Sequence, residues 1–257
     1  MRALLSAAAK IAVMALLAHG AAASAAEVTV LSTPTLKSAL EKLGAQFERS
    51  SGHKLKLEYG TSAVLKRQID AGQAFDLAIL VPASLDALIK EGKIAAGTRT
   101  DISRSAVGVA IRAGAAKRDV GTIDGFKRTL LEAKSISYSG EGVSGKYFTG
   151  LIDRLGIAAD VKPKLRPLPG GAVVEPVAKG EVDIAVITIA NIVGVPGAEV
   201  AGLLPPELQS YTLYTAGVAA GAKNADAAKA LIALLMAPET TASIVAAGME
   251  RVPPHPK

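Results

Sequence analysis

The chain has 257 residues, of which 50% are hydrophobic and 20% charged, with 25 glycines, 13 prolines and no cysteine. This composition excludes a disordered or collagen-like chain and provides enough apolar residues for the core of one large or two small domains. Without cysteine there is no disulfide, thiolate nucleophile or cysteine-based metal site. The histidines, His19, His53 and His255, lie in a leader, a turn and a proline-rich tail, so a histidine general base is not expected.

Residues 1–26 have the three-part pattern of a secretory signal peptide. Arg2 is followed by an apolar run and then by small residues over 21–26, which predicts cleavage just before Ala26 or Glu27. Lys10 interrupts the apolar stretch and leaves it too short to span a membrane. Because no cysteine follows the cut, no lipid anchor is expected, and the mature protein is predicted to be free in the periplasm.

The mature chain has a modest positive charge. Without Arg2 and Lys10 the 29 basic residues become 27, which against 23 acidic residues leaves a net charge of +4. These charges are spread along the chain, without a dense basic block and with few aromatic residues, so nucleic-acid binding is not expected. A positive balance favours an anionic ligand, although most of these side chains are expected to be solvated.

Segments typical of strands and helices alternate along the mature chain. A first strand over 28–31 is followed by apolar residues at helical spacing from Leu36 to Phe47. Later strands are expected over 55–59, 77–81, 106–111, 135–139, 183–187 and 213–220. Later helices are expected over 62–71, 123–133, up to about 155, 172–179, 225–236 and 239–247. This alternation predicts the α/β class, with parallel-rich sheets flanked by helices.

The number of units exceeds what one sheet holds easily, yet no Pro/Ser-rich linker divides the chain. Two lobes joined by crossing hinge strands reconcile both facts. The long apolar strands 106–111 and 213–220 are the expected crossings. We therefore expect one lobe over 27–107 with 215–257 and a second lobe over 108–214.

Small hydroxyl residues or glycines stand directly before a helix at several strand-to-helix junctions. These junctions lie at 32–35, 60–63, 140–145 and 169–171. Each offers free backbone N–H groups and the positive end of a helix dipole, which bind anions. A single such junction is most simply an N-cap, but several in one α/β chain favour a shared crevice. Lys37 and Lys146, near helix starts, either add charge to this crevice or are solvated.

One of these loops matches most of a phosphate-binding motif. Gly140 and Gly145 have its spacing, and Lys146 follows as the motif requires. Tyr147 stands where the motif needs a small metal-binding hydroxyl, and an exported chain does not meet cytoplasmic ATP. Nucleotide hydrolysis is therefore not expected, and a simple anion loop and a flexible glycine turn remain equal alternatives.

Several local motifs resemble those of the molybdate-binding proteins of ABC importers and, more widely, of the type II periplasmic solute-binding proteins. The resemblance covers nearly all of residues 27–251. The best match is the stretch 59–72, with its Gly-Thr-Ser and Gln-Ile-x-x-Gly elements, followed by Phe-Asp-Leu at 75–77. Weaker matches are at 35–40, 142–147 and 180–184.

The resemblance implies a two-lobed fold with the ligand in the cleft between the lobes. The ligand contacts it implies are Thr35, Thr61, Ser62, Ser144, Gly170, Gly171 and Thr188. The chain also departs from the family pattern. Thr188 replaces a tyrosine that donates to the oxyanion, Asn191 replaces a usual acidic residue, and Val143–Ser144 replaces Pro-Ala. The tyrosine donor is therefore expected to be lost.

The function implied is that of a monomeric periplasmic solute-binding protein that passes a small anion to an ABC permease in the inner membrane. A tetrahedral oxyanion such as molybdate is the preferred ligand, and a small organic carboxylate is the alternative. The absence of tryptophan disfavours sugars and large aromatic ligands. An extracytoplasmic sensor subunit would use the same closing motion and stays open as a second role.

An enzyme is not expected. The carboxylates near the suspected loops, Asp76, Glu141, Glu175 and Asp183, form no obvious pair and no metal motif. Glu141 is the one that could act as an acid or base, although an exposed loop glutamate is the simpler interpretation. No catalytic residue, metal or cofactor is therefore predicted.

Overall fold

The computed structural model describes residues 25–252. The expected signal peptide, apart from its last two residues, and the tail 253–257 lie outside the described residues. The first strand, β1, begins at Glu27, which is one of the expected mature N-termini.

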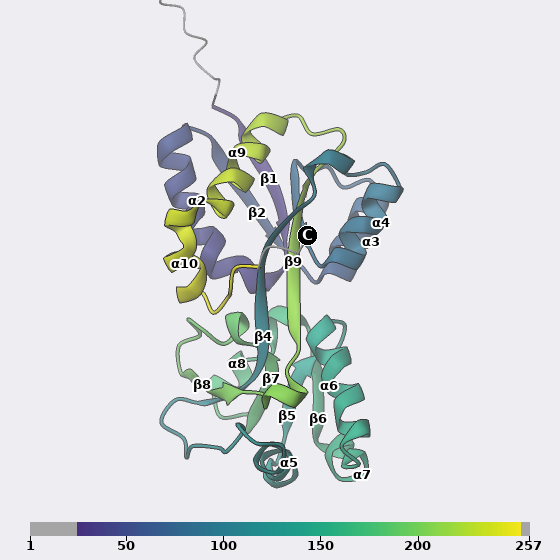
Figure 1. Cartoon of the computed structure of the whole chain (residues 1–257), viewed down its shortest axis with the longest axis vertical. Helices are drawn as coiled ribbons and strands as arrows, with labels where there is room; N and C mark the ends of the chain where they lie inside the picture. Colours follow the sequence, from purple (N-terminus) through teal and green to yellow (C-terminus); the bar gives the residue numbers. More distant parts are fainter. Residues whose placement is uncertain (1–24, 253–257) are drawn as a thin grey trace, which may run out of the picture.

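Two lobes lie one above the other along the long axis of the molecule (Figure 1). The elements of the upper lobe are β1 (Glu27–Ser32), η2 (Pro34–Leu36), α2 (Lys37–Ser51), β2 (Lys54–Tyr59), α3 (Ser62–Asp70), β3 (Leu77–Leu80), α4 (Pro82–Lys90), η3 (Ala96–Thr98), α9 (Ala225–Met236), η8 (Pro238–Thr240) and α10 (Thr241–Ala246). Those of the lower lobe are α5 (Ile123–Glu132), β5 (Ile136–Ser139), α6 (Val143–Arg154), α7 (Ala158–Val161), η4 (Lys162–Lys164), β6 (Leu165–Leu168), η5 (Gly170–Ala172), α8 (Glu175–Ala178), β7 (Ile184–Thr188), η6 (Ile189–Asn191), β8 (Ala198–Leu203) and η7 (Pro206–Leu208).

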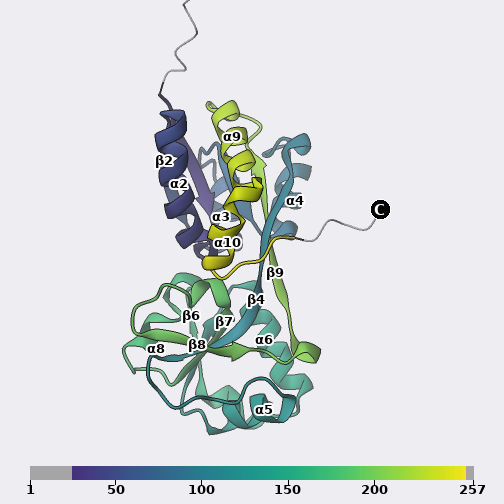
Figure 2. The same ribbon diagram turned by 60° about the vertical axis from the view of Figure 1, so that its left-hand side comes forward.

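Two long strands, β4 (Thr100–Arg112) and β9 (Tyr211–Val218), pass from one lobe into the other (Figures 1 and 2). They join the lobes into one sheet of order β2-β1-β3-β9-β4-β7-β5-β6, and β8 pairs with β4. Strands β2 and β3 pair parallel to β1, strands β6 and β7 pair parallel to β5, and the crossing strands pair antiparallel. The expected two-lobed α/β fold with two crossing strands is confirmed.

Strand β4 changes partner in its middle. Its first half, as far as Ala106, pairs with β9, and from Val107 onward it pairs with β7 and β8. The lobe boundaries expected at 107/108 and 214/215 stay a prediction, and this change of partner lies next to the first of them.

Each lobe has its own hydrophobic core. In the upper lobe, Leu40 and Phe47 of α2 pack with Leu231 of α9, on the helical face expected from the sequence. In the lower lobe, Phe126 of α5 and Phe148 of α6 are fully buried in the main cluster. The upper cluster also contains Ala190 of η6 and residues of β4 and β9, so the crossing strands and η6 join the lobes.

Several elements differ from the expectations. Helix α4 and strand β8 are not among the expected elements, although Pro82 at the first helical position and buried Leu85 and Leu88 are usual helix signals. Helix α8 is only four residues long, where a helix over 172–179 was expected. Pro176 explains the difference, because it donates no helical hydrogen bond and restricts the residue before it.

No single helix within residues 25–252 is both long and apolar enough to cross a membrane. Among the described residues, only the pair formed by α9 and Pro238–Ala246 has the length and composition of a membrane span, and its two segments meet at an angle of 63°. The apolar face of α9 is buried in the core of the upper lobe.

Replacing Gly248 by alanine is expected to destabilise the fold. Gly248 has φ +74°, and a Cβ there would lie 2.9 Å from the Ala190 Cα of the lower lobe. The positive φ alone costs about 1 kcal/mol, or roughly 2–4 °C in Tm, and the close contact adds to it. The matched control is Gly52→Ala, since Gly52 has φ +75° and open space around it. Equal decreases in Tm for both variants would contradict the prediction.

Candidate functional site

The carboxyl ends of two sets of three parallel strands meet between the lobes. Loops that follow β1, β2 and β3 face loops that follow β5, β6 and β7 across an inner pocket of about 230 Å³. An outer cleft of about 1270 Å³ adjoins this pocket, and both share the lining residues Pro34, Thr61, Glu141, Gly170 and Asn191. The shared crevice expected from the sequence is therefore formed by segments far apart in the chain.

Most of the residues expected to contact a ligand line the inner pocket. These are Thr35, Thr61, Ser62, Ser144, Gly170 and Thr188. Gly171 instead lines the outer cleft, because the chain turns into η5 at this point. Lys146 lies at the inner pocket and Lys37 at the outer cleft. Contact of each of them with a ligand stays a prediction.

A hydrogen-bond network centred on Asn191 joins the lobes. The Asn191 side-chain amide donates to the Thr35 hydroxyl of the upper lobe at 2.9 Å and to the Thr188 hydroxyl of the lower lobe at 2.7 Å. The Tyr214 hydroxyl also donates to Thr35, at 3.0 Å. A hydroxyl accepts two hydrogen bonds and donates one, so Thr35 keeps its own proton for a further acceptor.

Tyr214, on the crossing strand β9, is only 2% exposed. Burial raises the pKa of its phenol above the ordinary value, although hydrogen bonds with neighbouring threonines oppose this shift. The phenol is therefore neutral at physiological pH and can donate. The sequence predicts the loss of a tyrosine donor at Thr188, yet the pocket contains a tyrosine hydroxyl from another strand. Its position inside the expected crossing strand was the available signal.

Ser62 does not cap α3. Thr61 is the N-cap residue, and its hydroxyl accepts from the Val64 amide at 3.3 Å. Ser62 is the first helical residue, and its hydroxyl accepts from the Val81 amide at 3.0 Å, at the end of β3. Because Val81 holds the hydroxyl as an acceptor, the Ser62 proton is available to a ligand in the pocket.

The loop that resembles a phosphate-binding motif is built for close packing. A Cβ on Gly145 would overlap the Ser139 carbonyl oxygen, so this glycine allows α6 to approach β5 and is not part of a flexible turn. The Ser139 hydroxyl accepts from the Gly142 amide at 3.1 Å. The Tyr147 hydroxyl donates to the Leu208 carbonyl at 2.8 Å, which places it in a structural contact.

Two of the four carboxylates singled out in the sequence support the fold. Asp76 is 5% exposed and accepts from the amides of Thr29 and Asn224, both at 2.9 Å. Asp183 pairs with Arg118 at 2.9 Å and accepts from the Lys134 amide at 3.0 Å. Neither side chain lines the inner pocket or the outer cleft.

The other two carboxylates, Glu175 and Glu141, line the cleft. Glu175 pairs with Lys179 at 2.7 Å, and the hydrogen bond from this lysine lowers the pKa of the Glu175 carboxyl. Glu141 of the lower lobe lies 3.5 Å from Arg67 of the upper lobe, and both side chains are exposed. An exposed pair of this kind contributes little to stability but adds a second contact across the cleft.

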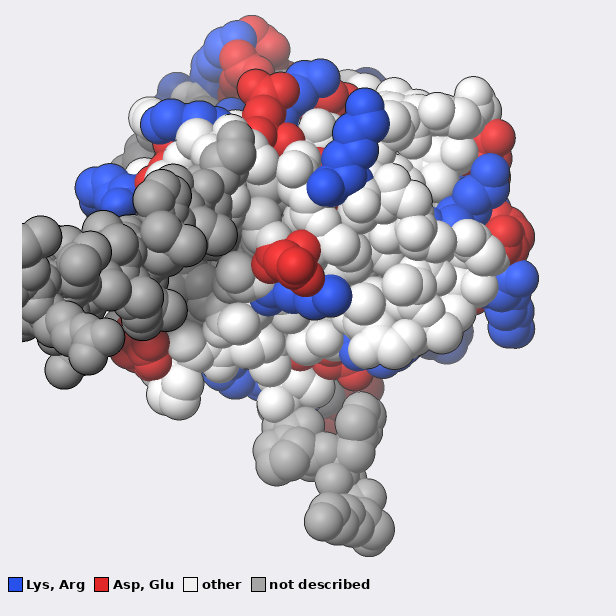
Figure 3. Space-filling view, turned by 90° about the horizontal axis from the view of Figure 1, so that it is seen from above, with Lys and Arg blue, Asp and Glu red and all other residues white. Residues whose placement is uncertain are grey.

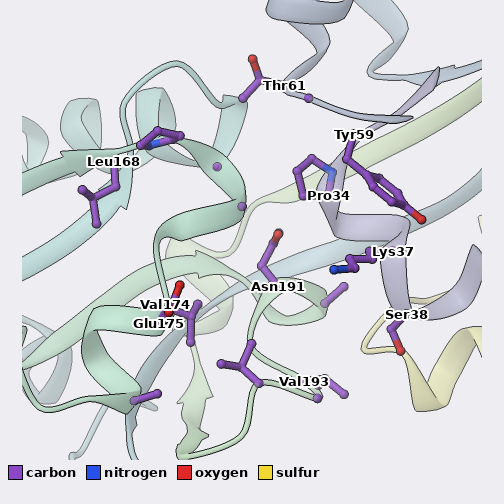
Figure 4. Close-up of a pocket in the computed structure, with 18 of the residues that line it drawn as sticks. Pro34, Lys37, Ser38, Tyr59, Thr61, Leu168, Val174, Glu175, Asn191 and Val193 are labelled. Atoms are coloured by element: carbon purple, nitrogen blue, oxygen red, sulfur yellow. The ribbon is translucent and has the colours of Figure 1, made fainter. Parts of the chain in front are cut away.

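The outer cleft is wide and has mixed polarity. Figure 4 shows Lys37 and Asn191 reaching toward the space between the lobes from opposite sides. Burial, with a smaller effect from the Glu41 charge, raises the pKa of Tyr59 to about 12.

On the face of the upper lobe seen from above, basic and acidic side chains are interspersed around an uncharged area (Figure 3). Within residues 25–252 no three His, Asp or Glu side chains gather as metal ligands.

Other polar residues also line the inner pocket, and of these only Thr33 lies in a junction that was expected to border the crevice. These are Thr33, Ser84, Ser139 and Thr212, in addition to Tyr214. Ser84 belongs to α4, which was itself not expected, and Thr33 precedes the family-like motif by two residues. Hydroxyl residues at strand ends were the signal that could have identified Thr33 and Ser139.

Replacing Ser62 by alanine is expected to lower both stability and anion affinity. The Val81 amide would lose its acceptor, and a ligand would lose one donor worth about 1 kcal/mol, or roughly fivefold in Kd. The control is Thr122→Ala, which removes the side-chain cap of α5 in a helix outside the pocket. We expect Thr122→Ala to lower Tm and leave affinity unchanged. Unaltered calorimetric affinity in Ser62→Ala would contradict a ligand role for this hydroxyl.

Known proteins share both the sequence pattern and the fold. The pattern of the bacterial extracellular solute-binding protein family matches residues 28–250. The chain is 28% identical to an aconitate isomerase of Pseudomonas sp over 235 residues, and this alignment covers 89% of each chain. It is 25% identical over 215 residues to the molybdate-binding protein ModA of Escherichia coli K12, which covers 81% of this chain and 83% of that protein.

The periplasmic molybdate-binding protein of Azotobacter vinelandii has a similar structure. The TM-score is 0.75 at 19% sequence identity, over 89% of this chain and all of the other. This likeness supports the two-lobed fold.

Proposed function

Because this chain belongs to the family of bacterial extracellular solute-binding proteins, we propose that its inner pocket binds a small organic carboxylate and presents it to an ABC importer. The main support is the direction of the hydrogen bonds in the pocket. Thr35 accepts from Asn191 and Tyr214, and Ser62 accepts from Val81, so both hydroxyl protons are left for an acceptor such as a carboxylate.

The pocket is suited to an anion although its lining side chains provide little positive charge. The N-termini of α3 and α6 reach the pocket at Ser62 and Ser144, and each contributes free amides and a positive dipole end. Lys146 is the basic side chain among the described lining residues, and the acidic Glu141 is engaged by Arg67. Recognition by neutral donors therefore dominates over ion pairing.

The inner pocket, of about 230 Å³, leaves room for an anion larger than a five-atom oxyanion. The similarity to an aconitate isomerase supports an organic anion, whereas the similarity to molybdate-binding proteins supports the oxyanion that the sequence favoured.

Transport is the role that this fold supports best. Ligand in the cleft would add contacts to both lobes and favour their closure about β4 and β9, and a permease in the inner membrane would recognise the closed form. The signal-like N-terminus and the family both agree with a location outside the cytoplasmic membrane. A sensor subunit remains the alternative, because it would use the same closure.

An isomerase is the second candidate function, favoured by the similarity to an aconitate isomerase over 89% of both chains. Moving a double bond requires a group that removes a proton from one carbon and returns it to another. Among the described residues, Glu141, Lys146 and Tyr214 are the titratable side chains that line the inner pocket. Proton NMR of aconitate with the purified protein in D2O tests this candidate, since turnover would incorporate deuterium and change the isomer ratio.

A ligand screen tests the proposed function. At a concentration of about a hundred times Kd, a bound carboxylate should stabilise the protein by roughly 2.7 kcal/mol and raise Tm accordingly. Thermal shifts followed by calorimetry would be measured with aconitate, citrate, succinate, acetate, molybdate, tungstate, sulfate and phosphate. Tight molybdate binding without carboxylate binding would overturn the proposal in favour of the oxyanion.

Replacing Asn191 by aspartate is expected to weaken carboxylate binding at least tenfold. The new carboxylate would accept the protons of Thr35 and Thr188, which reverses the hydrogen bonds, and it would repel an anion. The control is Asp226→Asn on the exposed surface of α9, which changes the charge away from the cleft. Calorimetry at two salt concentrations measures both variants, and equal affinity of Asn191→Asp and wild type would contradict the role of Asn191.

A further inference from the structure

The inner pocket extends beyond the Asn191 network to the start of α4. Thr33, Val81, Ala83 and Ser84 line this part. The Thr33 amide donates to the Ile79 carbonyl at 3.3 Å, so the ends of β1 and β3 lie side by side where the chain enters α4. This wall is therefore built from different elements than the wall that carries Asn191 and Thr188.

Thr33 has a feature that the packing of the protein does not explain. The residue is 4% exposed, and its side-chain hydroxyl is buried with no hydrogen-bond partner in the described part of the chain. A buried hydroxyl without a partner is unfavourable, and valine would fill the same space without this cost. A threonine at the wall of a polar pocket is explained if the ligand provides the missing partner.

The groups next to Thr33, at the start of α4, are also hydrogen-bond donors. No hydrogen bond of the Ser84 hydroxyl occurs within residues 25–252, and this side chain is half-buried in the first turn of α4. Helix α4 begins with Pro82, which has no amide proton, and the amides of Ser84 and Leu85 donate to the Val81 carbonyl at 3.1 Å. The Ala83 amide is therefore the one without a partner among the described residues at this end of the helix, where the dipole is positive. Asp86, the nearest acidic residue of α4, is engaged by Arg99 at 2.8 Å. The group of donors is thus suited to a second negative charge.

We infer that Thr33, Ser84 and the first turn of α4 form a second anion subsite, so that the ligand carries at least two carboxylates. This inference rests on the proposed function, because it assumes that a carboxylate binds in the inner pocket. Both donor groups line one cavity of about 230 Å³, so a single di- or tricarboxylate can contact both. A monocarboxylate would satisfy only one of them.

Thr33→Val tests the second subsite, because valine keeps the shape of threonine and removes only the hydroxyl. We expect the Kd for aconitate and succinate to increase roughly five- to tenfold, while the Kd for acetate, measured by ligand-detected NMR, stays unchanged. The Tm of the ligand-free variant should be equal to or higher than that of wild type, because a buried unpaired hydroxyl is removed. Thr33→Ser should retain the wild-type affinity, and Ser84→Ala should weaken the same ligands.

The outcomes separate this inference from the proposed function. If wild type binds aconitate or succinate and Thr33→Val binds them equally well, the second subsite is wrong and the proposed function stands. A parallel loss of acetate and dicarboxylate affinity, or a lower Tm, would show a structural role for Thr33 and also overturn the subsite. If wild type binds no carboxylate at all, the proposed function itself fails.

Discussion

The side-chain amide of Asn191 uses both of its protons inside the protein, one on Thr35 and one on Thr188. This choice fixes the direction of the hydrogen bonds in the inner pocket, because a hydroxyl that accepts must donate elsewhere. Tyr214 adds a second donor to Thr35, and burial keeps this phenol neutral by raising its pKa. Under the proposed function, the hydroxyl proton of Thr35 is therefore free for a ligand.

The same amide connects the two lobes, so the donor set depends on their relative position. Strands β4 and β9 bring the lobes together, and the contact between Arg67 and Glu141 adds a second link across the cleft. A ligand that takes the proton of Thr35 bonds to a group already shared by both lobes. Under the proposed function, binding and closure would thus be coupled through a few neutral hydrogen bonds, which are less sensitive to salt than ion pairs.

Much of the architecture follows from local patterns. The alternation of strands and helices predicts the α/β class, and the apolar positions of α2 are buried as their spacing indicates. The strands 106–111 and 213–220 predicted the crossings because each is a long apolar strand at which the strand–helix pattern restarts. The helical pattern fails at Pro176, which shortens α8, whereas Pro82 is a usual helix-start signal and α4 could have been predicted from it.

The sequence by itself determined that hydroxyl and glycine residues follow strands, and the resemblance to a family indicated which of them would face a ligand. Only the tertiary structure placed Tyr214 in the same pocket and gave Thr35 its hydrogen-bond partners. The reason is distance along the chain: Thr35 meets Asn191 across 156 positions and Tyr214 across 179. Periodicity reports which side of an element is buried, but the direction of a hydroxyl proton depends on partners that only the order of strands brings close.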